Sequence, residues 1–181
     1  LLQKTTPVNF SIHAKEEIPM IKNPNKISFF TQAESVEDIK ELLNLGIRSF
    51  VIDNEVDLER IQQAIDKTKT QINLSIRMKF QEHRIGTGRY FVYGLSSNKV
   101  NQTIQKIKNH PQIKNLGIHL HRKSQNTSEW EIVEEIKDSL TKETLERINM
   151  INLGGGLPST YRSSNVNVFE YIFKKLENTQ K

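Results

Sequence analysis

The chain has 181 residues, which suffices for one domain or at most a small pair of domains. Its apolar runs are far shorter than the roughly 18 residues that span a bilayer, no secretory leader is recognisable, and there is no cysteine for disulfides or thiolate metal sites. The net charge of +5 comes from lysines and arginines that are mixed with acidic residues, so we expect a cytoplasmic protein with no membrane and no nucleic-acid partner.

Short apolar runs alternate with amphipathic helical patterns along the chain. The helix that follows Ser35 has the clearest ends, because Ser35 and Asp38 form a capping box and Gly46 terminates the pattern. In chain order, strands are predicted at 8–14, 27–30, 47–52, 72–79, 116–121 and 149–153, and helices at 35–45, 55–69, 98–110, 128–140, 141–148 and 167–178.

The alternation of strands and helices indicates βαβ units and a parallel sheet, hence an α/β fold. Because polar, glycine-rich loops follow the strand ends, the pattern favours a (β/α)8 TIM-type barrel whose site lies on that face. We find about six strands where a closed barrel has eight. The prediction is therefore an incomplete barrel that forms a single partial domain over residues 1–181.

The first connection is too short for an ordinary crossover helix, and Pro19 and Pro24 interrupt any helix there. Either the first strand pairs differently, or the chain skips residues between Lys15 and Glu16. We favour the skip, and we expect the last barrel units to be absent after Lys181.

A run of three glycines, Gly154 to Gly156, directly follows the last predicted strand. Bare backbone of this kind lets N–H groups approach phosphate oxygens closely, which predicts a phosphate cradle. The alternative is a tight turn that needs a positive φ.

Two further stretches carry candidate chemistry. His119 and His121 are two residues apart on a strand and point the same way. They are either ordinary strand-end histidines or, together with His13 and a carboxylate, ligands of a metal ion. We expect the first alternative and no metal site. Lys15 closes the first strand, and it is either a surface lysine or a Schiff-base lysine in a barrel mouth.

Taken in this order, Lys15, the stretch "GIHLHRKS" and the stretch "INLGGGLP" resemble the pyridoxal-phosphate-dependent decarboxylases with an alanine-racemase-like barrel of fold type III. This is the ornithine, diaminopimelate and arginine decarboxylase group. Residues 26–61 are also similar to strand–helix units of that family, so the resemblance covers nearly the whole chain. It implies pyridoxal 5′-phosphate as the cofactor.

The resemblance also implies roles for single residues. Lys15 would hold the cofactor as an aldimine and His121 would stack on its pyridine ring, and these two are the expected catalytic residues. Arg122-Lys123 departs from the small apolar residue and glycine that the family has there. The implied cofactor-binding residues are Lys15, Arg77, His121, Ser124, Gly154, Gly155 and Gly156.

The implied activity is that of a carbon–carbon lyase, which decarboxylates ornithine, arginine, lysine or diaminopimelate in polyamine or lysine biosynthesis. The implied partners are a small-molecule amino-acid substrate and a second copy in a homodimer. The family's C-terminal β-domain is expected not to be in this sequence. Two alternatives stay open: a pyridoxal-phosphate-dependent amino-acid racemase on the same barrel, and a non-catalytic paralogue that regulates a protein partner.

Overall fold

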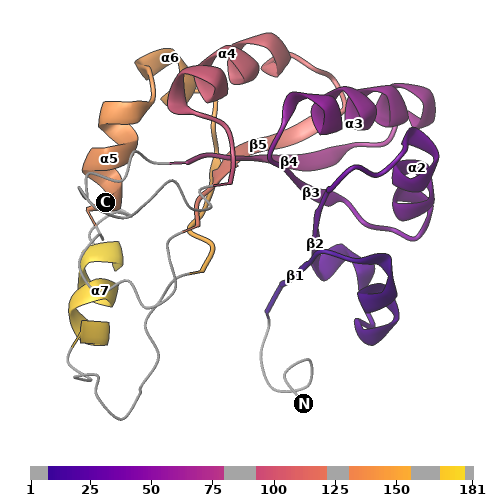
Figure 1. Cartoon of the computed structure of the whole chain (residues 1–181), viewed down its shortest axis with the longest axis horizontal. Helices are drawn as coiled ribbons and strands as arrows, with labels where there is room; N and C mark the ends of the chain where they lie inside the picture. The colour runs from indigo at the N-terminus through magenta and orange to yellow at the C-terminus, as the bar shows by residue number, and fades with distance from the viewer. Residues whose placement is uncertain (1–7, 80–92, 122–130, 156–167, 178–181) are drawn as a thin grey trace.

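The computed structural model describes residues 8–79, 93–121, 131–155 and 168–177. Its six strands form one sheet in chain order, and every neighbouring pair is parallel (Figure 1). The strands are β1 (Phe10–Ile12), β2 (Ile27–Phe30), β3 (Ser49–Ile52), β4 (Ile72–Arg77), β5 (Ile113–His119) and β6 (Met150–Asn152). The helices are η1 (Lys15–Met20), η2 (Pro24–Lys26), α2 (Val36–Asn44), α3 (Glu55–Thr68), α4 (Ser97–Ile107), α5 (Ile132–Ser139), α6 (Lys142–Leu145) and α7 (Val168–Glu177).

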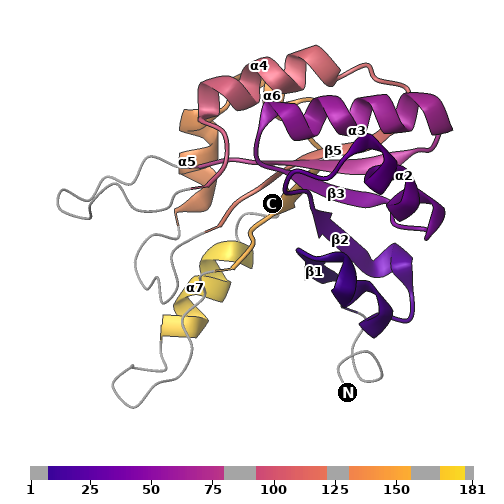
Figure 2. The ribbon, with the colours of Figure 1, turned by 45° about the vertical axis from the view of Figure 1, so that its right-hand side comes forward.

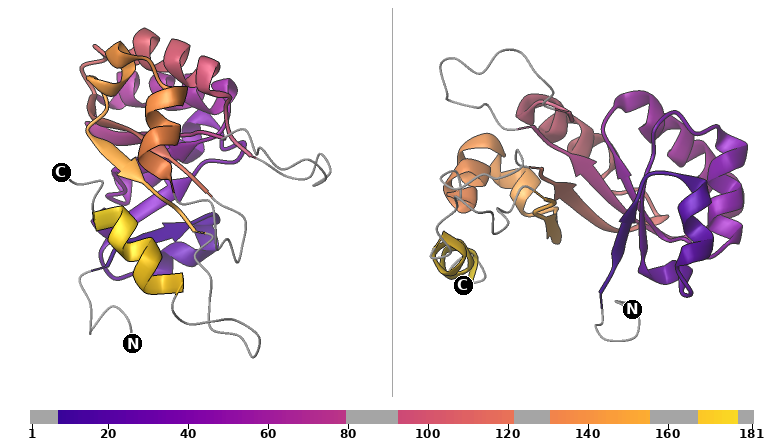
Figure 3. Two further views of the ribbon diagram at one scale, coloured as in Figure 1. Left: turned by 90° about the vertical axis from the view of Figure 1, so that its left-hand side faces the viewer. Right: turned by 60° about the horizontal axis from the view of Figure 1, so that its bottom comes forward.

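The sheet is curled, and helices α2 to α6 follow its outer side (Figures 2 and 3). The core contains side chains from both layers, including the fully buried Phe29, Phe50 and Leu74 of the strands and Leu42 and Ile61 of the helices. This arrangement is a half-barrel of parallel strands, so the predicted incomplete (β/α)8 barrel is confirmed. Among the described helices, none is long and apolar enough to cross a membrane.

The first crossover is built differently from an ordinary βαβ unit. Two short 3-10 helices connect β1 to β2, with Pro19 inside η1 and Pro24 at the start of η2. A 3-10 turn needs few hydrogen bonds, so it tolerates the prolines that would break an α-helix. Ile18 and Ile21 are buried here, and β1 pairs in parallel with β2. In this chain the short connection is thus made by two 3-10 turns instead of a crossover α-helix, and the predicted skip between Lys15 and Glu16 stays a prediction.

Helix α2 begins and ends as its residues predict. The Ser35 side chain accepts a hydrogen bond from the Asp38 N–H, and the Asp38 carboxylate accepts one from the Ser35 N–H, which completes the capping box. Gly46 follows the C-cap with a φ of 93°, a conformation that favours glycine.

Strand β5 begins earlier than the apolar pattern predicts. It starts at Ile113, before Lys114 and Asn115 interrupt the apolar run, and it pairs with β4 across a register shift near Ile72 and Asn73. All six strands run the same way, so their carboxyl ends meet at one edge of the sheet. Side chains that lie at or just after those ends are therefore brought together.

Candidate functional site

A cavity of about 330 Å³ lies where five of the six strands end. Its wall contains three imidazoles and one guanidinium, and among the described residues neither a carboxylate nor a lysine lines it. Ligand sites of parallel α/β proteins are found at this edge of the sheet. We call it the histidine cavity, and its lining residues are Ser11, His13, Phe30, Arg77, His119, His121, Asn152, Gly154 and Gly155.

Three aromatic rings from different strand ends pack against one another in this wall. His13 stacks on Phe30 with ring centroids 4.4 Å apart, and Phe30 meets His119 edge to face with centroids 4.8 Å apart. Phe30 and His119 are buried, with 6% and 3% of their surface exposed. The Phe30 ring therefore fixes both imidazole planes and shields His119 from solvent.

Arg77 is the last residue of β4, and its guanidinium is held from two sides. Its Nη1 lies 4.0 Å from an Asp53 carboxylate oxygen, and its Cζ lies 5.3 Å from the centroid of the Tyr93 ring. Gly94 has a φ of 108°, and a Cβ there would come within 2.7 Å of the Arg77 carbonyl oxygen. Only glycine lets the chain pass so close to Arg77.

The glycine turn lies directly on His119, the last residue of β5, and on His121, which follows that strand. Gly154 has a φ of 62°, and a Cβ on it would lie 1.9 Å from the Leu120 carbonyl oxygen and 3.0 Å from Cε1 of His119. A Cβ on Gly155 would lie 3.1 Å from Cε1 of His121. Residues 119 to 121 therefore occupy the space where side chains on these glycines would be. The expected tight turn with positive φ is present at Gly154.

Asn152 fixes the shape of this turn. Its Oδ1 accepts a hydrogen bond from the Gly154 N–H with an N–O distance of 2.9 Å. An asparagine that bonds the backbone two residues ahead forms an Asx turn. The Gly154 N–H is thus directed at a protein oxygen, and phosphate binding by the glycine run stays a prediction.

The electrostatics of the cavity favour neutral histidines when no anion is present. Burial lowers the pKa of His119 to about 4, and the positive charge of Arg77 and the neighbouring His121 act in the same direction. The pKa of His121 is also lowered, first by burial and then by Arg77 and His13. Burial lowers the pKa of Arg77 too, while Asp53 opposes that change.

Two nitrogens of the cavity residues have no hydrogen-bond partner within the described residues: Nδ1 of His119 and Nε of Arg77. Leaving a buried polar atom unpaired costs about 1–3 kcal/mol. Unpaired polar atoms that converge on one cavity indicate a place for a ligand that supplies the missing partners.

Lys15 lies away from this set. It belongs to η1 and does not line the histidine cavity, and its Nζ contacts the carboxylates of Asp38 and Glu41 on α2, with 3.1 Å to the Glu41 oxygen. The hydrogen bond to Asp38 is the main reason why the pKa of Lys15 is raised. Of the residues predicted for the site, the structure brings together Arg77, His121, Gly154 and Gly155, and it does not bring Lys15 to them.

Ser124 and Gly156, and with them the unusual Arg122-Lys123 pair, lie outside the described residues. Five residues of the cavity wall were not assigned to the cofactor site from the sequence: Ser11, Phe30 and Asn152, and also His13 and His119, which were considered only as metal ligands. Asn152 had a readable signal, because asparagine two residues before a glycine is typical of an Asx turn. Within the described residues, no cluster of three or more His, Cys, Asp or Glu side chains is suited to a metal ion.

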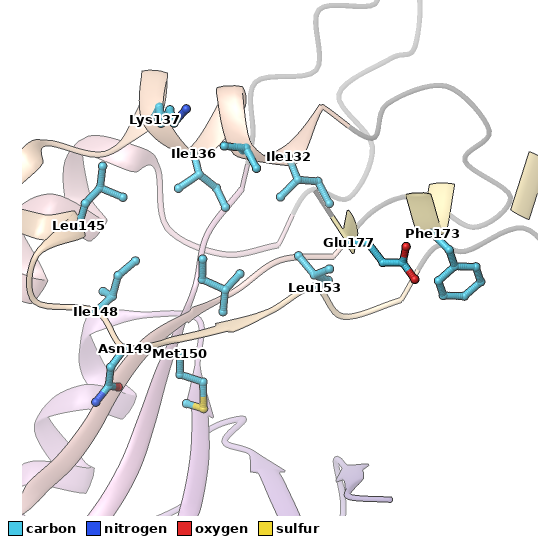
Figure 4. Close-up of a pocket in the computed structure, with 12 residues that line it drawn as sticks. Ile132, Ile136, Lys137, Leu145, Ile148, Asn149, Met150, Leu153, Phe173 and Glu177 are labelled. Atoms are coloured by element: carbon cyan, nitrogen blue, oxygen red, sulfur yellow. The ribbon is translucent and has the colours of Figure 1, made fainter. Parts of the chain in front are cut away.

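A larger groove of about 870 Å³ runs between α5, β6 and α7 (Figure 4). Its lining is mainly aliphatic, with Ile132, Ile136, Leu145 and Met150 in its wall and Phe173 half-exposed at one end. It shares no lining residue with the histidine cavity. The groove has few groups that could take part in chemistry, so we assign the candidate site to the histidine cavity.

The chain is similar to a known protein family. Residues 2–181 match the family model described as pyridoxal-dependent decarboxylase, pyridoxal binding domain. No curated protein matches the chain.

Several solved structures share the fold. Lysine decarboxylase from Selenomonas ruminantium is 15% identical, with a TM-score of 0.74 over 98% of this chain. Diaminopimelate decarboxylase from M. jannaschii, in complex with L-lysine, is 20% identical, with a TM-score of 0.74 over 94% of this chain. Arginine decarboxylase from Paramecium bursaria Chlorella virus is 18% identical, with a TM-score of 0.64 over 94% of this chain. The chain spans about half of each, namely 48%, 44% and 47% of their lengths.

Proposed function

Because the chain belongs to the pyridoxal-dependent decarboxylases, as a pyridoxal binding domain, we propose that the protein decarboxylates a basic or diamino acid with pyridoxal 5′-phosphate as its cofactor. The observation that carries the proposal is the histidine cavity at the carboxyl ends of the strands, with its cationic lining and two unpaired nitrogens. The solved relatives act on lysine, diaminopimelate and arginine, which supports the substrate class.

The cavity residues fit the anionic and aromatic parts of this cofactor. Arg77 and the imidazoles provide positive charge or N–H donors without a competing carboxylate in the described wall, which suits a phosphate. The close approach at Gly154 and Gly155 leaves backbone rather than side chains beside His119 and His121. An aromatic ring can lie flat against a face of His121, as the resemblance implies.

The bound cofactor would supply an electron sink for the bond that breaks when carbon dioxide leaves. In this proposal Arg77 and the glycine turn hold the anionic end, and His121 orients the ring plane. The buried Phe30 ring forms an apolar side of the cavity, and His13 stacks on it. Binding of this kind raises the rate by keeping the reacting bond in one orientation.

The proposal includes Lys15 as the residue to which the cofactor is predicted to be attached, although the position of its side chain does not support this role. Its ammonium group is paired with two carboxylates, and it would have to leave both to reach a ligand in the cavity. The proposal further includes one barrel domain over residues 1–181, a homodimer and a cytoplasmic location, as the resemblance implies.

The test uses the intact protein incubated with pyridoxal 5′-phosphate. We expect an absorbance band of bound cofactor that borohydride abolishes, and release of carbon dioxide from lysine, ornithine, arginine or diaminopimelate. Failure to bind the cofactor would refute the proposal. Cofactor binding with inversion of the amino acid and no carbon dioxide would indicate the racemase alternative, and binding of neither cofactor nor amino acid would favour the regulatory paralogue.

Peptide mapping after borohydride reduction identifies the lysine that carries the cofactor. Label on the peptide that contains Lys15, and loss of the label in Lys15→Ala, would support the predicted attachment. A label that persists in Lys15→Ala places the attachment elsewhere in the protein and removes Lys15 from the site. The matched control is Lys40→Ala, which removes another paired lysine, bonded to Glu37 on α2.

A further inference from the structure

His119 is the most deeply buried ionisable residue of the histidine cavity, and the protein holds its ring on several sides. The edge of the ring faces Phe30, and Cε1 lies against the backbone of Gly154. Only 3% of the residue is exposed. A ring held this firmly presents its free nitrogen in a fixed direction, which is what a ligand-binding group requires.

The nitrogen without a partner can be identified. Nδ1 has no hydrogen-bond partner within the described residues, whereas a hydrogen bond with the Asn152 side chain favours the protonated ring. We assign this interaction to Nε2, because Nδ1 is the nitrogen without a partner and the Asn152 oxygen already faces the turn at Gly154. In the neutral ring Nδ1 then has a lone pair, and in the protonated ring it has an N–H.

Titratable or charged groups face His119 from the ends of three strands. His13 follows β1, Arg77 ends β4 and His121 follows β5, while the carboxylate of Asp53 lies beyond Arg77. Asn152 of β6 and Phe30 of β2 carry no charge. An anion in the cavity would therefore be the first negative charge to touch His119, and it would favour the protonated ring.

We propose that Nδ1 of His119 binds the anionic group of the ligand, and that the ring takes up one proton from solvent when the anion enters. The lone pair of Nδ1 forms the new N–H bond, and no electron is transferred. His119 is thus a ligand-binding residue in addition to those that the resemblance implies. The inference rests on the proposed function, which identifies the anionic group as the cofactor phosphate.

The experiment follows the histidine Cε1–H resonances of the intact protein by NMR as a function of pH, with and without saturating inorganic phosphate. Sulfate serves as a second anion, because its charge does not change over the same pH range. We expect the pKa of His119 to rise by about one unit or more when either anion binds. An unchanged His119 titration with bound anion would overturn the proposal.

Two substitutions test which nitrogen acts. The amide of asparagine lies near the position of Nδ1, and that of glutamine lies near the position of Nε2. We expect His119→Gln to weaken the affinity for pyridoxal 5′-phosphate and for phosphate about ten- to a hundredfold, and His119→Asn to weaken it less. Equal affinities in both variants, with unchanged circular dichroism, would refute the role of Nδ1.

The matched control is His110→Asn, because His110 pairs with Asp66 and does not line the cavity. Cofactor binding is measured by absorbance in the same samples. If the wild-type protein binds the cofactor but His119 behaves like His110, the inference fails and the proposed function stands. If the cofactor does not bind, the proposed function fails.

Discussion

The two ends of the same strands differ in a set of polar side chains, although the buried Oε1 of Gln112 before β5 also has no partner within the described residues. At the amino ends, Asn73 donates to Ser49 at 3.0 Å, Asn115 donates to Asn73 at 2.6 Å, and Asn149 donates to Asn115 at 2.9 Å. The Asn149 oxygen then accepts the Leu116 N–H at 3.2 Å. This amide ladder crosses β3, β4, β5 and the start of β6. At the carboxyl ends, by contrast, Arg77 and His119 keep unpaired nitrogens.

Pairing within the protein distinguishes polar groups that stabilise the sheet from polar groups that are available to bind a ligand. A polar side chain whose partners all come from the protein contributes to stability, and its register is fixed by those partners. An unpaired buried nitrogen destabilises the folded state, so it is retained where a ligand completes it. In barrels of this type the carboxyl-end face has the catalytic role and the amino-end face the structural one.

The largest effect is expected for Gly154→Ala at the carboxyl ends of the strands. Alanine would be strained at a φ of 62°, and its Cβ would lie 1.9 Å from the Leu120 carbonyl oxygen, so the turn must move. We expect the free energy of unfolding to fall by about 4 kcal/mol, measured by urea denaturation. Loss of ligand binding should accompany it.

Gly155→Ala is the matched control for that variant. Its Cβ would meet the His121 ring at 3.1 Å, a contact that a small ring shift relieves, and no positive φ is involved. Its effect on stability should be clearly smaller than that of Gly154→Ala. If the two variants were equally stable, the close packing of Gly154 on Leu120 and His119 would be disproved.

The pH dependence of stability tests the unpaired histidine. The pKa of His119 is about 4 in the folded protein, below its ordinary value of 6.5, so the unfolded chain binds the extra proton first. Its contribution is complete above about pH 6.5 and is lost as the pH falls to about 4, which amounts to about 3 kcal/mol. Urea midpoints should fall less steeply between these pH values in His119→Asn than in wild type. Parallel curves for the two proteins would contradict the prediction.

Asn115→Ala probes the opposite end of the strands. It removes the middle of the amide ladder, and it leaves the Asn73 oxygen and the Asn149 amide without their partners. Because these groups are partly exposed, we expect a loss of about 1–2 kcal/mol in the free energy of unfolding and unchanged ligand affinity. Asn44→Ala, at the exposed end of α2, is the control. A change in ligand affinity would show that the ladder is not purely structural.

Residues whose signals are local could be predicted from the sequence. The strand order follows from the alternation of patterns, and the α2 capping box follows from Ser35 and Asp38. Arg77 and His121 were assigned through the family resemblance, and their place in the cavity follows from positions at or just after a strand end. Parallel strands bring such positions to one edge whatever the details of the loops.

Residues whose role depends on register could not be predicted. The amide ladder exists only because Asn73, Asn115 and Asn149 are aligned by strand pairing, and each alone looks like a turn residue. The contact of Phe30 with His13 and His119 depends on the curl of the sheet. The two 3-10 turns of the first crossover were not predicted, because prolines exclude an α-helix but do not exclude 3-10 turns.

The substitution Lys15→Ala has the smallest expected effect on stability, and it tests the difference between the two strand ends most directly. It lies on the carboxyl-end side of β1, where the resemblance predicts a catalytic group, yet its ammonium group is paired with protein carboxylates as the ladder amides are paired with each other. A polar side chain that is already paired within the protein should have a structural role even at the carboxyl ends of the strands. Lys15→Ala should then lower the free energy of unfolding by less than about 1 kcal/mol and leave phosphate affinity unchanged. Urea denaturation and phosphate titration measure both. A variant that folds normally but loses the borohydride-sensitive cofactor would restore Lys15 to the site, because a satisfied lysine would then have left its partners to react.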